Sequence, residues 1–153
     1  MPHSVDIVAL LCLLSFSVLG SKKNILSVVL GLAVWGTCLI SLVMYSYPFV
    51  TFLVSMITFL SFNYVHMAVI VMCASIAYFL ENLLKFLSFP LAWVSLPKLI
   101  AGFLGSFLGL LKGFCIIFIV MLFLTDYNPQ WLYQSKIGLY FKVYFKDYLV
   151  FNH

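Results

Sequence analysis

Charged residues are scarce in this sequence, and arginine is absent. Only 8% of the 153 residues are charged and 65% are hydrophobic, which gives a mean hydropathy of +1.20. Soluble domains carry about a quarter charged residues, because a packed core needs a polar shell around it. This chain has too few polar residues to cover itself in water. The composition therefore predicts an all-α integral membrane protein, embedded in a lipid bilayer.

The shortage of charge also excludes one class of partner. All eight basic residues are lysines, and with four acidic residues they give a net charge of only +4, scattered along the chain. A nucleic-acid surface needs a denser basic patch, so we expect no nucleic-acid partner. A few lysines beside membrane spans more often set topology and contact anionic headgroups. The expected partners are the lipid bilayer and other membrane proteins or further copies of the chain.

Signatures of catalysis and of metal or cofactor binding are missing as well. The sequence contains no GxSxG, HExxH, CxxC, phosphate-loop or dinucleotide-binding glycine motif. Each cysteine lies alone in an apolar run, which is typical of a small buried hydrophobe. The four acidic residues form no local pair for acid–base chemistry. We therefore predict no catalytic residue, no metal ligand and no cofactor, and a protein that is not an enzyme.

Long apolar runs predict about four transmembrane helices within residues 1–125. No charged residue occurs between Lys23 and Glu81, an interval that holds two spans of about 20 residues and a connector. Asp6 and the lack of basic residues before the first apolar run argue against a cleaved signal peptide. The predicted spans cover residues 5–20, 25–47, 63–85 and 105–125.

Two further segments are not expected to cross the bilayer. The stretch 49–62, "FVTFLVSMITFLSF", follows Pro48, which disfavours helix at the residue before it. As a helix it would be only about 21 Å long, so we predict a short interfacial or re-entrant segment, with a tilted fifth span as the alternative. Residues 126–153 form a tail whose aromatic residues would oppose its lysines on a helix. That pattern predicts an amphipathic C-terminal tail in the headgroup plane, or alternatively a loosely ordered terminus with aromatic anchors.

Lysine positions indicate orientation through the positive-inside rule. The loops after the first and third spans hold one lysine more than the two terminal segments, which favours cytoplasmic loops and external termini. Lys112 adds to this margin if the last crossing begins near residue 108, because its long stem would then reach the cytoplasmic headgroups. Residues 98–107 would in that case run along or dip into the same interface.

Polar residues inside the apolar runs are the candidate functional residues: Lys112, His66 and Glu81. Two interpretations of His66 are open: an interfacial imidazole among aromatic anchors, or a site that binds a proton or a ligand. Glu81 precedes Lys85 by four residues, the spacing and order of a local helical ion pair. The alternative for Glu81 is a transport site, because ionisable groups in membrane spans often line pathways.

Glycines spaced four apart are the most specific local pattern. Gly105, Gly109 and Gly113 share one face of a helix, and such a face lets a neighbouring backbone approach closely. In lipid no hydrophobic drive brings helices together, so close packing carries more weight. The sequence predicts helix packing by these glycines, within the chain, between copies or against a partner.

The order of these features resembles the colicin V production (CvpA) family of small bacterial inner-membrane proteins over nearly the whole length. The shared elements are Asp6, Lys22-Lys23, Trp35-Gly36, the stretch Leu104-Gly105-x-x-x-Gly109-x-x-Lys112-Gly113, similar to the family's LGxxxGxx(R/K)G, and a Trp131…Ser135 element. The family usually has an Asp-Arg pair just before the glycines spaced four apart, and here those two positions are Ala101-Gly102. Any role of those two charges in the family therefore does not carry over to this chain.

The resemblance implies a multi-pass protein of the bacterial inner membrane that supports production or export of a peptide toxin of the colicin V type, or a broader envelope function. The residues themselves leave a second class open, a small oligomeric transporter or channel lined by Lys112, His66 or Glu81.

Overall fold

The computed structural model describes residues 4–22, 24–57, 59–88, 98–128 and 130. This part of the chain forms four helices, α1 (Ser4–Lys22), α2 (Ile25–Met56), α3 (Phe62–Ser88) and α4 (Lys98–Tyr127). The all-helical fold class predicted from the sequence is confirmed.

Three of these helices are long and apolar enough to cross a membrane, which makes the chain a membrane protein. They are α2, α3 over Phe62–Leu87 and α4 over Leu99–Tyr127, with hydropathies of 2.3, 1.9 and 2.6. A crossing takes about 20 apolar residues. Between 17% and 22% of their most apolar windows is buried within the chain, so most of each apolar surface faces outward. The shorter α1, with 19 residues, is not among the three.

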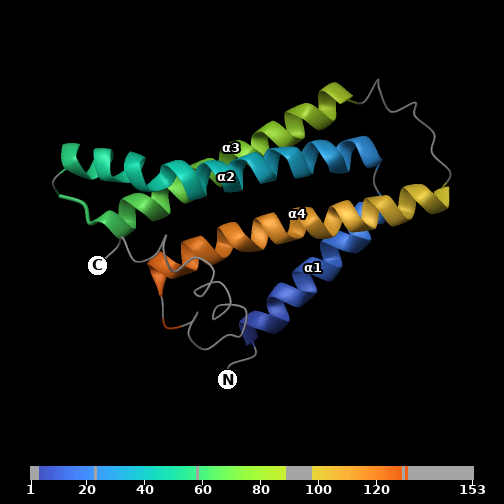
Figure 1. The fold of residues 1–153 in the computed structure, drawn as a ribbon, viewed down its shortest axis with the longest axis horizontal. Coiled ribbons are helices and arrows are strands. Elements are labelled where there is room, and N and C mark those ends of the chain that lie inside the picture. The colour runs from blue at the N-terminus through green and yellow to red at the C-terminus, as the bar shows by residue number, and fades with distance from the viewer. Residues whose placement is uncertain (1–3, 23, 58, 89–97, 129, 131–153) are drawn as a thin grey trace.

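The helices run back and forth and meet at two ends. α2 and α3 lie side by side, α4 packs against both, and α1 packs against the first half of α4 (Figure 1). The end of α1, the start of α2, the end of α3 and the start of α4 gather at one end (Figure 1). We call it the basic end, because Lys22 and Lys85 lie in the last turns of α1 and α3. The opposite end, where α2 and α4 finish and α3 begins, is called the far end.

The apolar core is small and joins α2, α3 and α4. Its buried members are Trp35, Leu42, Val50, Val65, Val69, Ile70, Ala77 and Ile119. Large apolar side chains also cover the outside, for example Met44, Phe79 and Phe103, which are 62%, 66% and 76% exposed. Soluble proteins rarely expose contiguous apolar patches of more than a few hundred Å². The exterior therefore suits lipid.

Several hydroxyl groups on the outer faces donate within their own helices. Ser15, Thr37 and Ser75 each donate to the carbonyl oxygen four residues earlier, at 2.8 to 2.9 Å. In hydrocarbon no water is available to such groups, so this local bonding keeps the outer surface effectively apolar.

The expected end of the second helix at residues 46–48 is wrong. Pro48 lies inside α2, and residues 49–56 continue the helix instead of forming an interfacial or re-entrant segment. Proline removes one helical N–H and crowds the carbonyl four residues before it. In apolar surroundings the helix is retained because breaking it would expose further backbone groups that cannot be satisfied in lipid. α2 therefore reaches a length of about 48 Å.

The start of the fourth helix also differs from the expectation. α4 begins at Lys98, so residues 98–107 are its first turns and do not form a separate interfacial stretch. Gly102 does not interrupt α4, and no described glycine adopts a positive φ. Asp126 and Tyr127, expected to begin the C-terminal tail, are the last residues of α4. Residues 131–153, the main part of the predicted amphipathic tail (126–153), lie outside the described residues.

Candidate functional site: a glycine seam and two buried polar clusters

The backbones of α1 and α4 approach each other closely at several glycines. A Cβ added at Gly105 would clash with the carbonyl oxygen of Gly20 and lie 3.1 Å from its carbonyl carbon. A Cβ at Gly109 would clash with the carbonyl oxygen of Phe16 and lie 3.1 Å from the Cα of Gly20. Backbone atoms cannot move aside as a side-chain end can. Glycine is therefore required on both helices.

Two further contacts extend this interface along α4. The hydroxyls of Ser17 and Ser106 lie 2.6 Å apart, and a Cβ at Gly113 would lie 3.2 Å from the side chains of Leu13 and Phe16. We call Gly20, Gly105, Gly109, Gly113 and this serine pair the glycine seam. The three glycines singled out in the sequence all face α1, so the contact lies within one chain. Gly102, on the same helix, has nothing within 4 Å of an added Cβ.

A buried carboxylate connects the other three helices near the basic end. The side chain of Glu81 on α3 is 5% exposed, and its Oε1 accepts from the ammonium groups of Lys112 on α4 and Lys85 on α3, the latter at 2.5 Å. Its Oε2 accepts from Nε1 of Trp35 on α2 at 2.7 Å. These four residues are the Glu81 cluster. Three charge-assisted or indole donors thus compensate the loss of water around one carboxylate.

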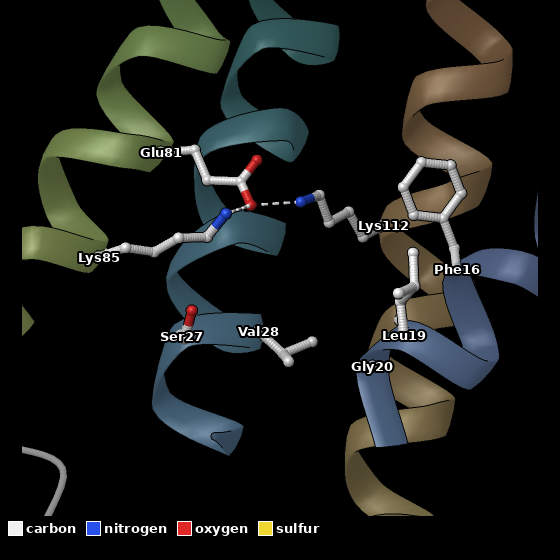
Figure 2. Close-up of a pocket in the computed structure, with 9 residues that line it drawn as sticks. Phe16, Leu19, Gly20, Ser27, Val28, Glu81, Lys85 and Lys112 are labelled. Carbon is white, nitrogen blue, oxygen red and sulfur yellow. Dashed lines mark hydrogen bonds and ion pairs between the residues drawn. The ribbon is translucent and has the colours of Figure 1, made fainter. Parts of the chain in front are cut away.

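The Glu81 cluster has room because of a glycine on α2. A Cβ at Gly31 would lie 2.9 Å from Oε1 of Glu81 and 3.3 Å from Nζ of Lys112. Beside the cluster lies a partly open cavity of about 40 Å³, bordered by α1 through Phe16, Leu19 and Gly20 (Figure 2). Figure 2 shows Lys85 and Lys112 reaching the same oxygen of Glu81 from opposite sides.

This pairing changes the interpretation of Lys112. The sequence suggested that its stem extends to the cytoplasmic headgroups from the first turns of the crossing. In the structure it lies near the middle of α4, its side chain is 13% exposed, and its ammonium contacts Glu81. The local pair of Glu81 with Lys85 forms as the spacing predicted. The carboxylate therefore joins a local and a distant lysine.

A second polar group connects the same three helices near the far end. Nδ1 of His66 on α3 lies 2.5 Å from Oδ2 of Asp126 on α4, and Nε2 of His66 lies 3.2 Å from Oγ of Ser46 on α2. The His66 side chain is 13% exposed and that of Asp126 is 6% exposed. These three residues are the His66 cluster. His66 thus has two polar partners besides the ring of Phe62, 5.9 Å away.

The His66 cluster has the hydroxyl–imidazole–carboxylate order of serine hydrolases. Such enzymes also need N–H donors near the hydroxyl that stabilise an oxyanion. Ser46 lies inside α2, where neighbouring N–H groups bond to carbonyls four residues earlier, and Pro48 has no N–H. Ser46 therefore lacks adjacent backbone donors for acyl transfer. Among the described residues, no group of three His, Cys, Asp or Glu is placed to hold a metal ion.

The two clusters lie at different depths along the bundle. His66 and Glu81 are fifteen residues apart on α3, about 22 Å along the helix. Between them α2, α3 and α4 contribute buried apolar side chains such as Leu42, Ile70 and Ile119. The hydrocarbon layer is about 30 Å thick, so a layer centred between the two clusters would have one cluster just inside each of its boundaries. No buried side-chain N or O atom of the described residues lacks a hydrogen bond.

Several members of these groups were not singled out in the sequence. Trp35 stands out in the sequence only through the resemblance, and nothing in the sequence marks Asp126 as a partner of His66. Gly20 and Gly31 were not considered as packing residues. For the glycines a signal exists, since Gly20 ends an apolar run and Gly31 lies among large residues. Apart from Lys85, the partners of Glu81 and His66 have no local signal, because they are 20 to 60 residues away.

The helices, the glycine seam and the two clusters together define a helical membrane protein with polar groups locked between its helices. No protein-family model, curated protein or solved structure matches the chain.

Proposed function

We propose that this chain is a four-span protein of the bacterial inner membrane that acts as the CvpA-type resemblance implies. It supports production or export of a peptide toxin, or a broader envelope function, by assembling with other membrane proteins, and it is not an enzyme. In the four-span topology α1 is the additional crossing, since its 19 residues extend about 28 Å. The basic end then faces the cytoplasm, as the positive-inside rule favours.

The geometry of the stretch that carries the resemblance supports this proposal. In the LGxxxGxxKG segment, Gly105, Gly109 and Gly113 face α1, and Lys112 reaches Glu81. The three glycines and the lysine of that pattern therefore each have a contact that depends on the residue type, whereas Leu104 is 40% exposed. A pattern in which most fixed residues contact another helix suits a protein that acts through its assembled shape.

One observation carries the choice of an assembly role over a conducting role. The two polar clusters are separated by a packed apolar core, with Leu42 and Ile70 each only 2% exposed. Water and ions need a continuous polar path across the hydrocarbon layer. A single chain offers no such path among its described residues. The polar groups therefore serve to hold the helices together.

The proposal is tested in the native host by deletion and by site-specific photocrosslinking. A photoreactive residue placed at Phe79 or Phe103, which are 66% and 76% exposed, should capture a membrane protein. Deletion should reduce the amount of exported peptide or weaken the envelope against detergent. In the deletion strain, Gly102→Ala should restore wild-type export or envelope resistance, whereas Gly105→Leu should not. The reason is that a side chain at Gly105 meets the backbone of Gly20, while nothing lies near an added Cβ at Gly102. A deletion that changes neither export nor envelope resistance would refute the proposal.

The alternative function is a small oligomeric transporter or channel. The observation that favours it is the presence of ionisable Glu81, Lys112 and His66 in or near membrane spans. A path would then have to form between copies of the chain. Purified protein in proteoliposomes should show ion or solute flux that is lost in Lys112→Gln under this alternative. Absence of flux from the unmodified protein supports the assembly role.

A further inference from the structure

We propose that the cavity beside the Glu81 cluster binds the phosphate group of an anionic phospholipid headgroup. This inference depends on the membrane location of the chain and not on the CvpA-type function. A lipid site can therefore exist whether or not the deletion phenotype is found.

The position of the cavity suits a headgroup. It lies between all four helices at the basic end, where Gly20 is two residues from the end of α1 and Lys85 is three residues from the end of α3. Glu81 is seven residues from the end of α3, about 10 Å along the helix. The headgroup layer on each side of a bilayer is about 5–8 Å thick. A phosphate that dips slightly below this layer reaches the cavity.

The charge of the cavity favours an anion. Two ammonium groups, from Lys85 and Lys112, meet one carboxylate there, so these three residues carry a net charge of +1. Both oxygens of Glu81 already accept hydrogen bonds. Each ammonium carries three N–H donors, so one lysine can contact more than one acceptor. A phosphodiester carries one negative charge and would balance the group.

A neutral donor lines the same space. Ser27, in the first turn of α2, borders the cavity, is half-buried and forms no hydrogen bond with the described residues. Its hydroxyl can donate to a phosphate oxygen. Figure 2 shows Ser27 below Glu81 and Lys85, on the same turn of α2 as Val28. The cavity thus combines two cationic donors with one neutral donor.

Size and lining distinguish a lipid from a free anion. The volume of about 40 Å³ is a few times the space that one water molecule occupies, about 10–15 Å³ on the same measure. It accepts a compact group such as phosphate but not a whole lipid. The wall on the α1 side is apolar, formed by Phe16 and Leu19 (Figure 2). Leu19 is 48% exposed, so acyl chains can continue along the outside of α1 while the phosphate stays at the lysines.

Basic pockets between membrane helices at the cytoplasmic side are an established mode of anionic lipid binding. The competing explanation is that Lys85 and Lys112 only neutralise Glu81. The two explanations differ in whether a lysine substitution changes lipid selectivity. Binding therefore has to be compared between phosphatidylglycerol and phosphatidylcholine, which share the phosphodiester but differ in net charge.

The test uses the full chain purified in mild detergent, with native mass spectrometry and thermal unfolding as readouts. Phosphatidylglycerol should form retained one-to-one adducts and raise the unfolding temperature, and phosphatidylcholine should do neither. Lys112→Gln and Lys85→Gln should weaken phosphatidylglycerol binding about tenfold, from the usual strength of a charge-assisted hydrogen bond. Lys22→Gln is the matched control, since Lys22 is exposed on α1 and does not border the cavity.

Two variants keep the test decisive if Lys112→Gln fails to fold. Lys112→Arg retains the charge and should bind phosphatidylglycerol normally. Lys85→Gln leaves the contact between Lys112 and Glu81 in place, and Lys85 has the more exposed side chain at 29%. Equal binding of the two lipids, or equal loss in Lys22→Gln and Lys85→Gln, would overturn the proposal. If inorganic phosphate or glycerol phosphate stabilised the protein and phosphatidylglycerol did not, the bound phosphate would not belong to a lipid, and the proposal would be contradicted.

Discussion

The α1–α4 interface and the α2–α3–α4 bundle are held together in lipid by different interactions. At the glycine seam the two backbones touch, and the hydrogen bond between the hydroxyls of Ser17 and Ser106 crosses it. In the bundle the helices are held apart by large apolar side chains and are connected by the Glu81 and His66 clusters. In lipid, hydrophobic burial does not drive helix association. Shape therefore holds one interface, and polar bonds hold the other.

This difference predicts which of the two interfaces tolerates substitutions. An interface of touching backbones has no side chain that can adjust, so an added methyl group is already too large. A polar cluster can adapt, because long side chains such as Lys85 and Lys112 can move. We therefore expect the glycine seam to be the more sensitive of the two.

The largest effect is expected at the centre of the seam. Gly109→Leu would place a side chain against the backbone of Phe16, and we expect destabilisation above the usual overpacking cost of about 1–3 kcal/mol. Unfolding in detergent, followed by circular dichroism, measures it. Gly102→Ala is the control and should be near neutral, because nothing lies within 4 Å of its added Cβ. Similar stability of the two variants would contradict the seam.

The next largest effect is expected at Glu81. Glu81→Leu leaves two lysines without their carboxylate, and we expect a loss of about 2–3 kcal/mol, less than for a fully buried pair because Lys85 can reach water. The double variant Glu81→Leu/Lys112→Leu should recover much of this loss, since the buried ammonium is removed as well. A double-mutant cycle with no coupling between the two positions would show that the contact in the Glu81 cluster does not matter for stability.

A smaller effect is expected at the far end. Asp126→Asn keeps the shape of the side chain but removes the negative charge beside His66. We expect a loss of about 1–2 kcal/mol, towards the lower end of what a hydrogen bond to a charged group contributes, because asparagine keeps an acceptor oxygen. Unfolding in detergent provides the measurement, with Ser55→Ala as the comparison, because the Ser55 hydroxyl donates to a carbonyl oxygen of its own helix. A loss at Asp126 no greater than at Ser55 would indicate that the His66 cluster does not stabilise the bundle.

The smallest effect is expected for the hydroxyl pair of the seam. Ser17→Ala removes the hydrogen bond to Ser106, and hydrogen bonds between membrane helices contribute about 0.6 kcal/mol on average. Ser15→Ala is the control, because Ser15 bonds only within α1. If Ser17→Ala were as damaging as Gly109→Leu, the seam would depend on polar bonding and the contrast with the bundle would fail.

The helices themselves could be predicted from the sequence, because a long apolar run in lipid satisfies its backbone hydrogen bonds by forming a helix. The positions of the apolar runs predicted α1 and α3 closely. The extension of α2 past Pro48 and the start of α4 at Lys98 were missed for one physical reason. Rules for helix breakers describe chains in water, whereas in lipid an unsatisfied backbone is more costly than a proline or glycine within a helix.

For the candidate site, the sequence indicated residues but not their partners. The spacing of Gly105 and Gly109 predicted a close-packing face, yet nothing in it identified Gly20 as the opposite surface. The spacing of Glu81 and Lys85 predicted their pair, whereas Lys112 joins them only through the packing of α4. Contacts between helices depend on rotation and tilt, which a periodic apolar sequence leaves undetermined.

The seam within one chain is tested most directly by cysteine crosslinking in native membranes. In a background with Cys12, Cys38, Cys73 and Cys115 replaced by alanine, the pair Ser17→Cys/Ser106→Cys brings two thiols to positions where the hydroxyls lie 2.6 Å apart. Mild oxidation should give rapid disulfide formation within the monomer, and the control pair Ser15→Cys/Ser106→Cys should react far more slowly. Equal rates for the two pairs, or disulfides only between chains, would contradict the account.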